Sequence, residues 1–300
     1  MWALNYLVLW LFRILVFLIR LLPRRAVLGL GTCLGFLAYA FLRRHRRLSL
    51  KNLKIAFGQT KSETERRRLA RQSFLHFGRM VLDTIKFASL KGQGRDQLIK
   101  VEGMDNLRQA SSQGRGVLIF SAHLGNWEVA SWAISSFTPL HVVARPLDNP
   151  LLEKELLRLR QALGAKVISK FLAARPILRA LQAQESVAIL IDQNVLRSQA
   201  VFVDFFGQPA ATTPALASFH LHSQAPLLPI FCLLTPERRH LVKIYPPLSF
   251  SAGNAPEPDA LLQITQVLTK MIEQEIRQYP EQWLWFHDRW RTRPAEEKID

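Results

Sequence analysis

The sequence predicts an α/β fold, in which helices cover a sheet, with an apolar helix at the N-terminus. From about residue 115, short apolar runs of strand length alternate with longer segments of helical period, which is typical of a sheet covered by helices. The chain has 300 residues, of which 49% are hydrophobic, enough for one large core. We therefore expect an anchor helix over residues 1–22 and a single domain over residues 23–300.

The N-terminal segment indicates contact with a membrane. Residues 2–22 are apolar except for Asn5, Arg13 and Arg20, and a helix of this length spans a bilayer of about 30 Å. Arg13 near the middle costs about 2.5–3.5 kcal/mol, against about 0.3–0.6 kcal/mol gained for each Leu, Ile, Phe or Val. The helix therefore either crosses the membrane or lies in its interface with the arginine side chains reaching out.

A second apolar run, residues 26–42, carries three glycines and ends at the basic sequence "RRHRR". Its length of about 17 residues favours a core helix over a second span. The dense arginines on both sides of it predict a cytoplasmic location and contact with anionic lipid.

Beyond residue 60 the pattern is that of a globular protein. Residues 60–88 have helical spacing, and Ser62 with Glu65 matches a capping box. The predicted strands are 117–121, 141–144, 187–191, 200–205, 227–233 and 241–245. The predicted helices that follow are 126–136, 151–163, 174–183, 213–223 and 259–278.

The sequence "HLGNWE" places His123 and Glu128 just after the strand at 117–121. On one continuous helix, positions five apart point about 140° away from each other. Gly125 permits a turn, however, and Asn126 is a good N-cap, so a helix that starts there leaves His123 in the loop and Glu128 in the first turn. We expect Glu128 to bond the imidazole, because a carboxylate behind a histidine fixes its tautomer and strengthens it as a base.

No protein nucleophile accompanies this pair. The chain has no G-x-S-x-G sequence, so a base here would act on a hydroxyl or water that the substrate brings. The competing interpretation is a structural histidine. No zinc-binding H-E-x-x-H sequence occurs either, and we expect neither a metal nor a cofactor.

The net charge of +17 predicts anionic partners. No motif of a nucleic-acid reader is present, and the N-terminus is too apolar for one, so nucleic acid is not expected. A basic, membrane-bound binding protein without enzymatic activity is the alternative to an enzyme.

Six segments together resemble the bacterial lipid A late acyltransferases, the lauroyl and myristoyl transferases within the lysophospholipid acyltransferase superfamily. They are "SLKNLKIAF" at 49–57, "HLGNWE" at 123–128, "ARPLDNPLLEKELLRLR" at 144–160, "IDQN" at 191–194, "VFVDFFGQPAATTPALA" at 201–217 and "YPEQWLWFHDRWRTRP" at 279–294. They occur in family order over nearly the whole chain.

The resemblance implies a mixed sheet like that of glycerol-3-phosphate acyltransferases, and a catalytic domain over 23–300. It implies that His123 is the general base and Glu128 its orienting carboxylate. Two structural roles compete with a functional one. Arg160 and Asp192 could form an ion pair with each other, and Asn149 with its neighbours could cap the next helix. The substrate-binding residues that the resemblance implies are Arg160, Asp192, Arg145 and Asn149.

The resemblance also implies the partners and the location. The acyl donor would be a thioester of acyl carrier protein and the acceptor a lipid A precursor, at the cytoplasmic side of the bacterial inner membrane, with no cofactor beyond the thioester. The alternative is another acceptor, such as a lysophospholipid, a glycolipid or an amino-lipid, and acyl-CoA as the donor.

Overall fold

The computed structural model describes residues 2–250 and 257–295. Its α-helices are α1 Trp2–Leu21, α2 Arg24–Phe41, α3 Arg43–Phe57, α4 Glu63–Ser89, α5 Gln93–Asp96, α6 Met104–Ser111, α7 Trp127–Ser135, α8 Pro150–Ala162, α9 Ala174–Gln182, α10 Ala215–Ser223 and α11 Glu257–Gln278. Its strands are β1 Ile99–Glu102, β2 Val117–Ser121, β3 Leu140–Ala144, β4 Ala165–Ser169, β5 Ser186–Leu190, β6 Val201–Phe205, β7 Gln208–Thr212, β8 Leu227–Leu234 and β9 His240–Ile244.

The main sheet has seven strands in the order β1-β9-β8-β2-β5-β3-β4. β8 and β9 are antiparallel and the other neighbours are parallel, so the predicted mixed α/β sheet is confirmed. β6 was predicted as a strand, but it pairs only with β7 in a separate antiparallel hairpin. β7 was not predicted, and neither were the short edge strands β1 and β4. Neither has a continuous apolar run, because edge strands need only one buried face.

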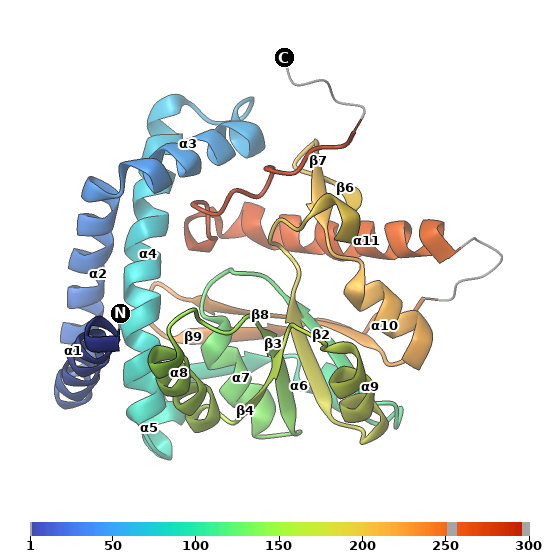
Figure 1. Ribbon diagram of the computed structural model, residues 1–300, viewed down its shortest axis with the longest axis horizontal. Helices are drawn as coiled ribbons and strands as arrows, with labels where there is room; N and C mark the ends of the chain where they lie inside the picture. The colour runs from blue at the N-terminus through green and yellow to red at the C-terminus, as the bar shows by residue number, and fades with distance from the viewer. Residues whose placement is uncertain (1, 251–256, 296–300) are drawn as a thin grey trace.

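Side chains of the central strands alternate between two cores, one on each face of the sheet. In β2, Leu118 and Phe120 belong to one core, while Val117 and Ile119 belong to the other. Figure 1 shows α11 lying along the first face and α7 and α6 beneath the second. Because both faces are covered, the central strands are apolar at nearly every position.

Helix α4 begins where the capping box predicts it. The Ser62 hydroxyl accepts from the Glu65 backbone N–H, and the Glu65 side chain reaches back to the Ser62 N–H at 2.7 Å. α2 packs closely along α4 (Figure 1). A Cβ on Gly35 would lie 2.3 Å from the Phe74 carbonyl oxygen, so this crossing requires glycine. One face of α2 is therefore packed against α4, which bears out the predicted core helix only in part, because the opposite face is exposed.

The outer faces of α1 and α2 are apolar and exposed. On α1 they include Leu7, Trp10, Leu11, Phe17 and Leu18, and on α2 Leu34, Phe36, Leu37 and Phe41. Within the described residues, no helix by itself has the length and apolarity of a membrane span. The 90° bent pair α2 and α3 meets that criterion only when the two helices are taken together.

Two polar residues of α1, Arg13 and Asn5, contact α8 and its N-cap, whereas Arg20 is exposed. Arg13 donates two hydrogen bonds to Glu155 on α8, the shorter at 2.7 Å, and Asn5 Oδ1 lies 3.3 Å from Asn149 Nδ2. The arginine that argues against a membrane helix is thus neutralised by a carboxylate of α8.

Candidate active site

The register of two neighbouring parallel strands brings His123 and Asp192 together. Ser121 of β2 pairs with Leu190 of β5, and each strand is followed two residues later by one of these side chains. The same edge of the sheet carries Arg145 after β3 and Lys170 after β4. The carboxyl ends of parallel strands are where open α/β sheets bind their ligands.

The loop after β2 has the predicted turn and cap. Gly125 has φ of +65°, and a Cβ there would lie 1.9 Å from the Cys232 carbonyl oxygen, so only glycine fits. Asn126 caps α7 by accepting from the Val129 N–H at 3.2 Å. His123 therefore lies in the loop and Glu128 in the first helical turn, as the sequence predicts.

Asp192 is bonded to the histidine ring. His123 Nδ1 lies 2.8 Å from Asp192 Oδ1, while the His123 backbone N–H and the Trp283 indole N–H donate to Oδ2 at 2.9 Å and 2.8 Å. Burial favours the neutral carboxyl, but the His123 charge and these hydrogen bonds outweigh it and lower the pKa of Asp192. An ionised Asp192 accepts a hydrogen bond from the Nδ1–H group. In the neutral ring this leaves Nε2 as the acceptor.

Helix α4 supports the loop from behind. His76 Nε2 lies 3.3 Å from the Gly125 carbonyl oxygen, and the Thr84 hydroxyl donates to Asn126 Oδ1 at 3.1 Å. Burial lowers the pKa of His76 to about 4, so the ring is neutral at neutral pH and donates this bond. One side chain of α4 therefore holds the backbone of the loop that carries His123, and a second holds the residue that caps α7.

The predicted bond between Glu128 and His123 is wrong. Glu128 instead accepts from Arg160 Nε at 3.1 Å and from Arg160 Nη2 at 2.8 Å. The alternative pairing of Arg160 with Asp192 is also wrong, because Asp192 bonds His123 and Trp283. The first turn of α7 directs the Glu128 carboxylate toward α8, where Arg160 compensates its charge.

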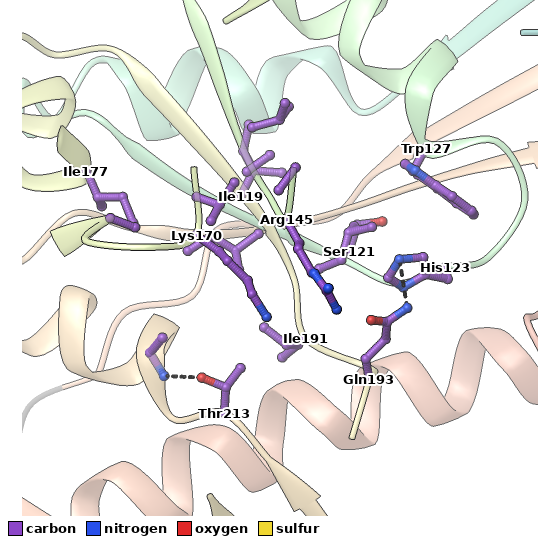
Figure 2. Close-up of a pocket in the computed structure, with 18 of the residues that line it drawn as sticks. Ile119, Ser121, His123, Trp127, Arg145, Lys170, Ile177, Ile191, Gln193 and Thr213 are labelled. Atoms are coloured by element: carbon purple, nitrogen blue, oxygen red, sulfur yellow. Dashed lines mark hydrogen bonds between the residues drawn. The ribbon is translucent and has the colours of Figure 1, made fainter. Parts of the chain in front are cut away.

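These side chains border a cavity of about 840 Å³. Figure 2 shows His123 at one side of it, beside Trp127 and Gln193, with Arg145 and Lys170 extending into the same space. Glu128 and Arg160 also line it. The rest of the wall is mostly apolar and includes Ile119, Ala130, Ile134, Ala188 and Ile230. The volume is that of a pocket for a small organic ligand or a chain.

The other predicted site residues differ in position. Arg145 lines the cavity and pairs with Asp148 at 3.0 Å. Asn149 caps α8 by accepting from the Leu151 N–H at 3.0 Å, so the capping alternative is confirmed; its role in substrate binding stays a prediction. In the part of the chain that the structure describes, no group of three or more His, Cys, Asp or Glu side chains could hold a metal ion.

Comparison with known proteins identifies the family. Residues 1–292 match the family described as bacterial lipid A biosynthesis acyltransferase. The chain belongs to this family. A lipid A biosynthesis palmitoleoyltransferase of Escherichia coli (strain K12) is 30% identical over 277 residues, which cover 92% of this chain and 88% of the relative. A lipid A biosynthesis lauroyltransferase of the same organism is 28% identical over 97% of this chain and 93% of the relative.

A more distant relative carries a different name. A phosphatidylinositol mannoside acyltransferase of Mycolicibacterium smegmatis is 25% identical over 74% of this chain and 72% of the relative. All three relatives are named as acyltransferases. Membership of the family makes this chain an acyltransferase, and the resemblance inferred from its six segments is confirmed.

Three side chains around His123 were not singled out by the sequence: Trp127, Gln193 and Trp283. Trp127 and Gln193 were inside quoted segments, beside the residues that were chosen. Trp283 belongs to "WLWFHDRWR", which reads as core aromatics with a basic rim. Trp283, Trp285 and Trp290 are indeed buried, but Arg289 is 0% exposed rather than on a rim.

Proposed function

We propose that this acyltransferase moves a fatty acyl chain from an acyl carrier protein thioester to a hydroxyl of a lipid A precursor, with His123 as the general base. The observation that carries the proposal is the orientation of the ring: Nδ1 is bonded to Asp192 at 2.8 Å, and the ring lines the cavity. Such a histidine takes a proton from a hydroxyl that the cavity holds against it.

The reaction then needs no acyl-enzyme intermediate. The acceptor oxygen attacks the thioester carbonyl carbon while its proton passes to His123 Nε2. When the tetrahedral intermediate collapses, the carbon–sulfur bond breaks and the thiolate takes that proton. Asp192 orients the ring and stabilises its charged form throughout, in the way that the aspartate of a serine-protease triad does.

Two cations that line the cavity, Arg145 and Lys170, suit anionic substrates. Arg145 and Lys170 follow neighbouring strands, and the Lys170 N–H donates to the Ala144 carbonyl at 2.8 Å, so the two residues are in register. In the sheet, β5 lies between β3, which precedes Arg145, and β2, which precedes His123. Neighbouring strands lie about 4.8 Å apart, so the ends of β3 and β2 are separated by two such spacings. Phosphate groups of the acceptor or of the pantetheine arm would bind here.

The proposed location is the membrane surface. The exposed apolar faces of α1 and α2 lie next to Arg25, Arg43, Arg44 and Arg47, which are themselves exposed. This arrangement suits insertion of apolar side chains among lipid chains with arginines at anionic headgroups. The net charge of +17 also favours an acidic carrier protein.

The experiment is a mass-spectrometric transfer assay on the detergent-solubilised protein. Acyl carrier protein and CoA thioesters serve as donors, and a lipid A precursor, a lysophospholipid and a phosphatidylinositol mannoside compete as acceptors. We expect mass to be added to the lipid A precursor from the carrier protein. Transfer only to another acceptor would contradict the proposed substrate and keep the chemistry, whereas no transfer to any acceptor would contradict the function.

The apolar wall on α7 predicts how chain length is set. Ala130 and Ile134 are one turn apart and both line the cavity. Ala130→Leu should favour shorter donors, because it removes space, and Ile134→Ala should favour longer ones, since each buried methylene contributes about 0.8 kcal/mol. The rates with a series of carrier-protein thioesters measure both. Identical chain-length profiles for the wild type and both variants would show that the chain lies elsewhere.

The ion pair of Glu128 and Arg160 predicts coupled losses. Their side chains are only 12% and 14% exposed, so Glu128→Gln leaves a poorly solvated guanidinium beside the cavity. Each single variant should lose kcat/KM, and the double variant Glu128→Gln/Arg160→Gln should lose less than the product of the two losses. The coupling free energy from this cycle should be about 0.5–3 kcal/mol. Strictly multiplicative losses would mean that the two side chains act independently.

A further inference from the structure

The side-chain amide of Gln193 faces the nitrogen that the proposed mechanism uses. Gln193 Nε2 lies 3.2 Å from His123 Nε2, as the dashed line in Figure 2 shows, and the residue lines the cavity. Gln193 directly follows Asp192, so one loop after β5 supplies contacts to both nitrogens of the ring. This contact is separate from the acid and base roles described so far.

The direction of the contact follows from hydrogen-bond chemistry. An amide nitrogen only donates, and the Nδ1 proton of the neutral ring is engaged by Asp192. The amide therefore donates to the lone pair of His123 Nε2. The lone pair that must accept the substrate proton is therefore already occupied by the Gln193 amide.

A substrate hydroxyl must displace this amide. General-base catalysis places the hydroxyl oxygen about 2.6–3.2 Å from Nε2, which is where the amide nitrogen lies. The next residue is anchored: the Asn194 N–H donates to His287 Nε2 at 3.0 Å, and its side chain bonds Thr292 at 3.0 Å. The backbone stays in place, so the displaced amide remains within a side-chain length of the attacked carbonyl.

On the basis of the proposed acyl transfer, we propose that Gln193 is a catalytic residue with two positions. In the empty enzyme its amide caps His123 Nε2. When the acceptor hydroxyl takes that place, the amide turns to donate to the thioester oxygen, which becomes an oxyanion as the new carbon–oxygen bond forms. When the carbon–sulfur bond breaks, the carbonyl reforms, the thiol leaves with the proton, and the amide returns to Nε2.

The test compares Gln193→Ala, Gln193→Met and Gln193→Glu with the wild type. Methionine keeps the length of the side chain without a donor, and Gln113→Ala, at an exposed position after α6, is the control. We expect Ala and Met to lower kcat by about 10²- to 10³-fold with similar KM and thermal unfolding midpoints. We expect Glu to lower it further, because a carboxylate repels an oxyanion.

A pH profile separates this role from a structural one. The NH₂ donor of Gln193 bonds only the neutral ring, so its removal favours the protonated ring, and the acid limb of kcat/KM should move to higher pH in the Ala and Met variants. If the wild type is active and Gln193→Ala has a rate within about threefold of it, or a faster one, the proposed role of Gln193 is overturned while the proposed function stands. A lower unfolding midpoint with an unshifted acid limb would overturn that role too, and a wild type without transfer would overturn the proposed function as well.

Discussion

Asp192→Asn is expected to lower kcat by about 10²- to 10⁴-fold with little change in KM. Two N–H groups, from Trp283 and the His123 backbone, point at Oδ2 and require an acceptor there. An asparagine would place its amide oxygen at that position and its NH₂ against His123 Nδ1. Nδ1 then has to accept, the ring proton moves to Nε2, and the nitrogen facing the cavity can no longer act as a base.

The steady-state rates of the acyl-transfer assay measure this effect. The control is Asp105→Asn, because the Asp105 side chain is 92% exposed on α6 and far in sequence from the site. The unfolding midpoint of Asp192→Asn should stay close to that of the wild type, because asparagine keeps the size of the buried side chain. A variant with wild-type kcat would show that the Asp192 bond does not set the tautomer used in catalysis.

Local signals in the sequence were enough for most of the fold. The strands of the central sheet are continuous apolar runs. The helices follow the expected period, and Ser62 and Asn126 cap α4 and α7. The edge strands and the pairing of β6 with β7 could not be predicted in the same way. Short strands with one buried face have weak patterns, and partner choice depends on contacts between distant segments.

The site was predictable only where its geometry is local. The turn at Gly125 and the cap at Asn126 correctly placed His123 in the loop. Glu128 was chosen as its partner because it is near in sequence, but the actual partner, Asp192, is 69 positions away. The register of β2 and β5 creates that pair, and no short motif encodes a register.

Two carboxylates near the loop after β2 therefore have different environments. Asp192 is 4% exposed, and among the described residues its donors are N–H groups of His123 and Trp283, which directs its charge to the ring. Glu128 has its charge compensated by Arg160. This difference predicts that Asp192→Asn will slow the reaction more than Glu128→Gln, although both residues lie close to His123 in the fold.

His123→Ala is expected to lower kcat by about 10²- to 10⁴-fold, because no other side chain is bonded to Asp192 Oδ1 among the described residues. The lost ring leaves a space beside Trp127, whose centroid lies 4.8 Å from that of His123, and this space opens to the cavity. Free imidazole added to the assay should therefore bind there and restore part of the rate. His222→Ala, at an exposed position on α10, should keep the wild-type rate and show no effect of imidazole.

The double variant His123→Ala/Asp192→Asn tests whether Asp192 acts by orienting the base or contributes to the rate independently of His123. In the proposed mechanism Asp192 acts on the reaction through the ring. Once the ring is absent, its carboxylate has no proton to orient, and the second substitution should cost almost nothing in kcat. Rescue by imidazole should nevertheless be weaker in the double variant, because the bound imidazole loses the same carboxylate. Equal multiplicative losses, with rescue unaffected by Asp192→Asn, would mean that Asp192 supports the fold of the loop rather than the chemistry of the ring.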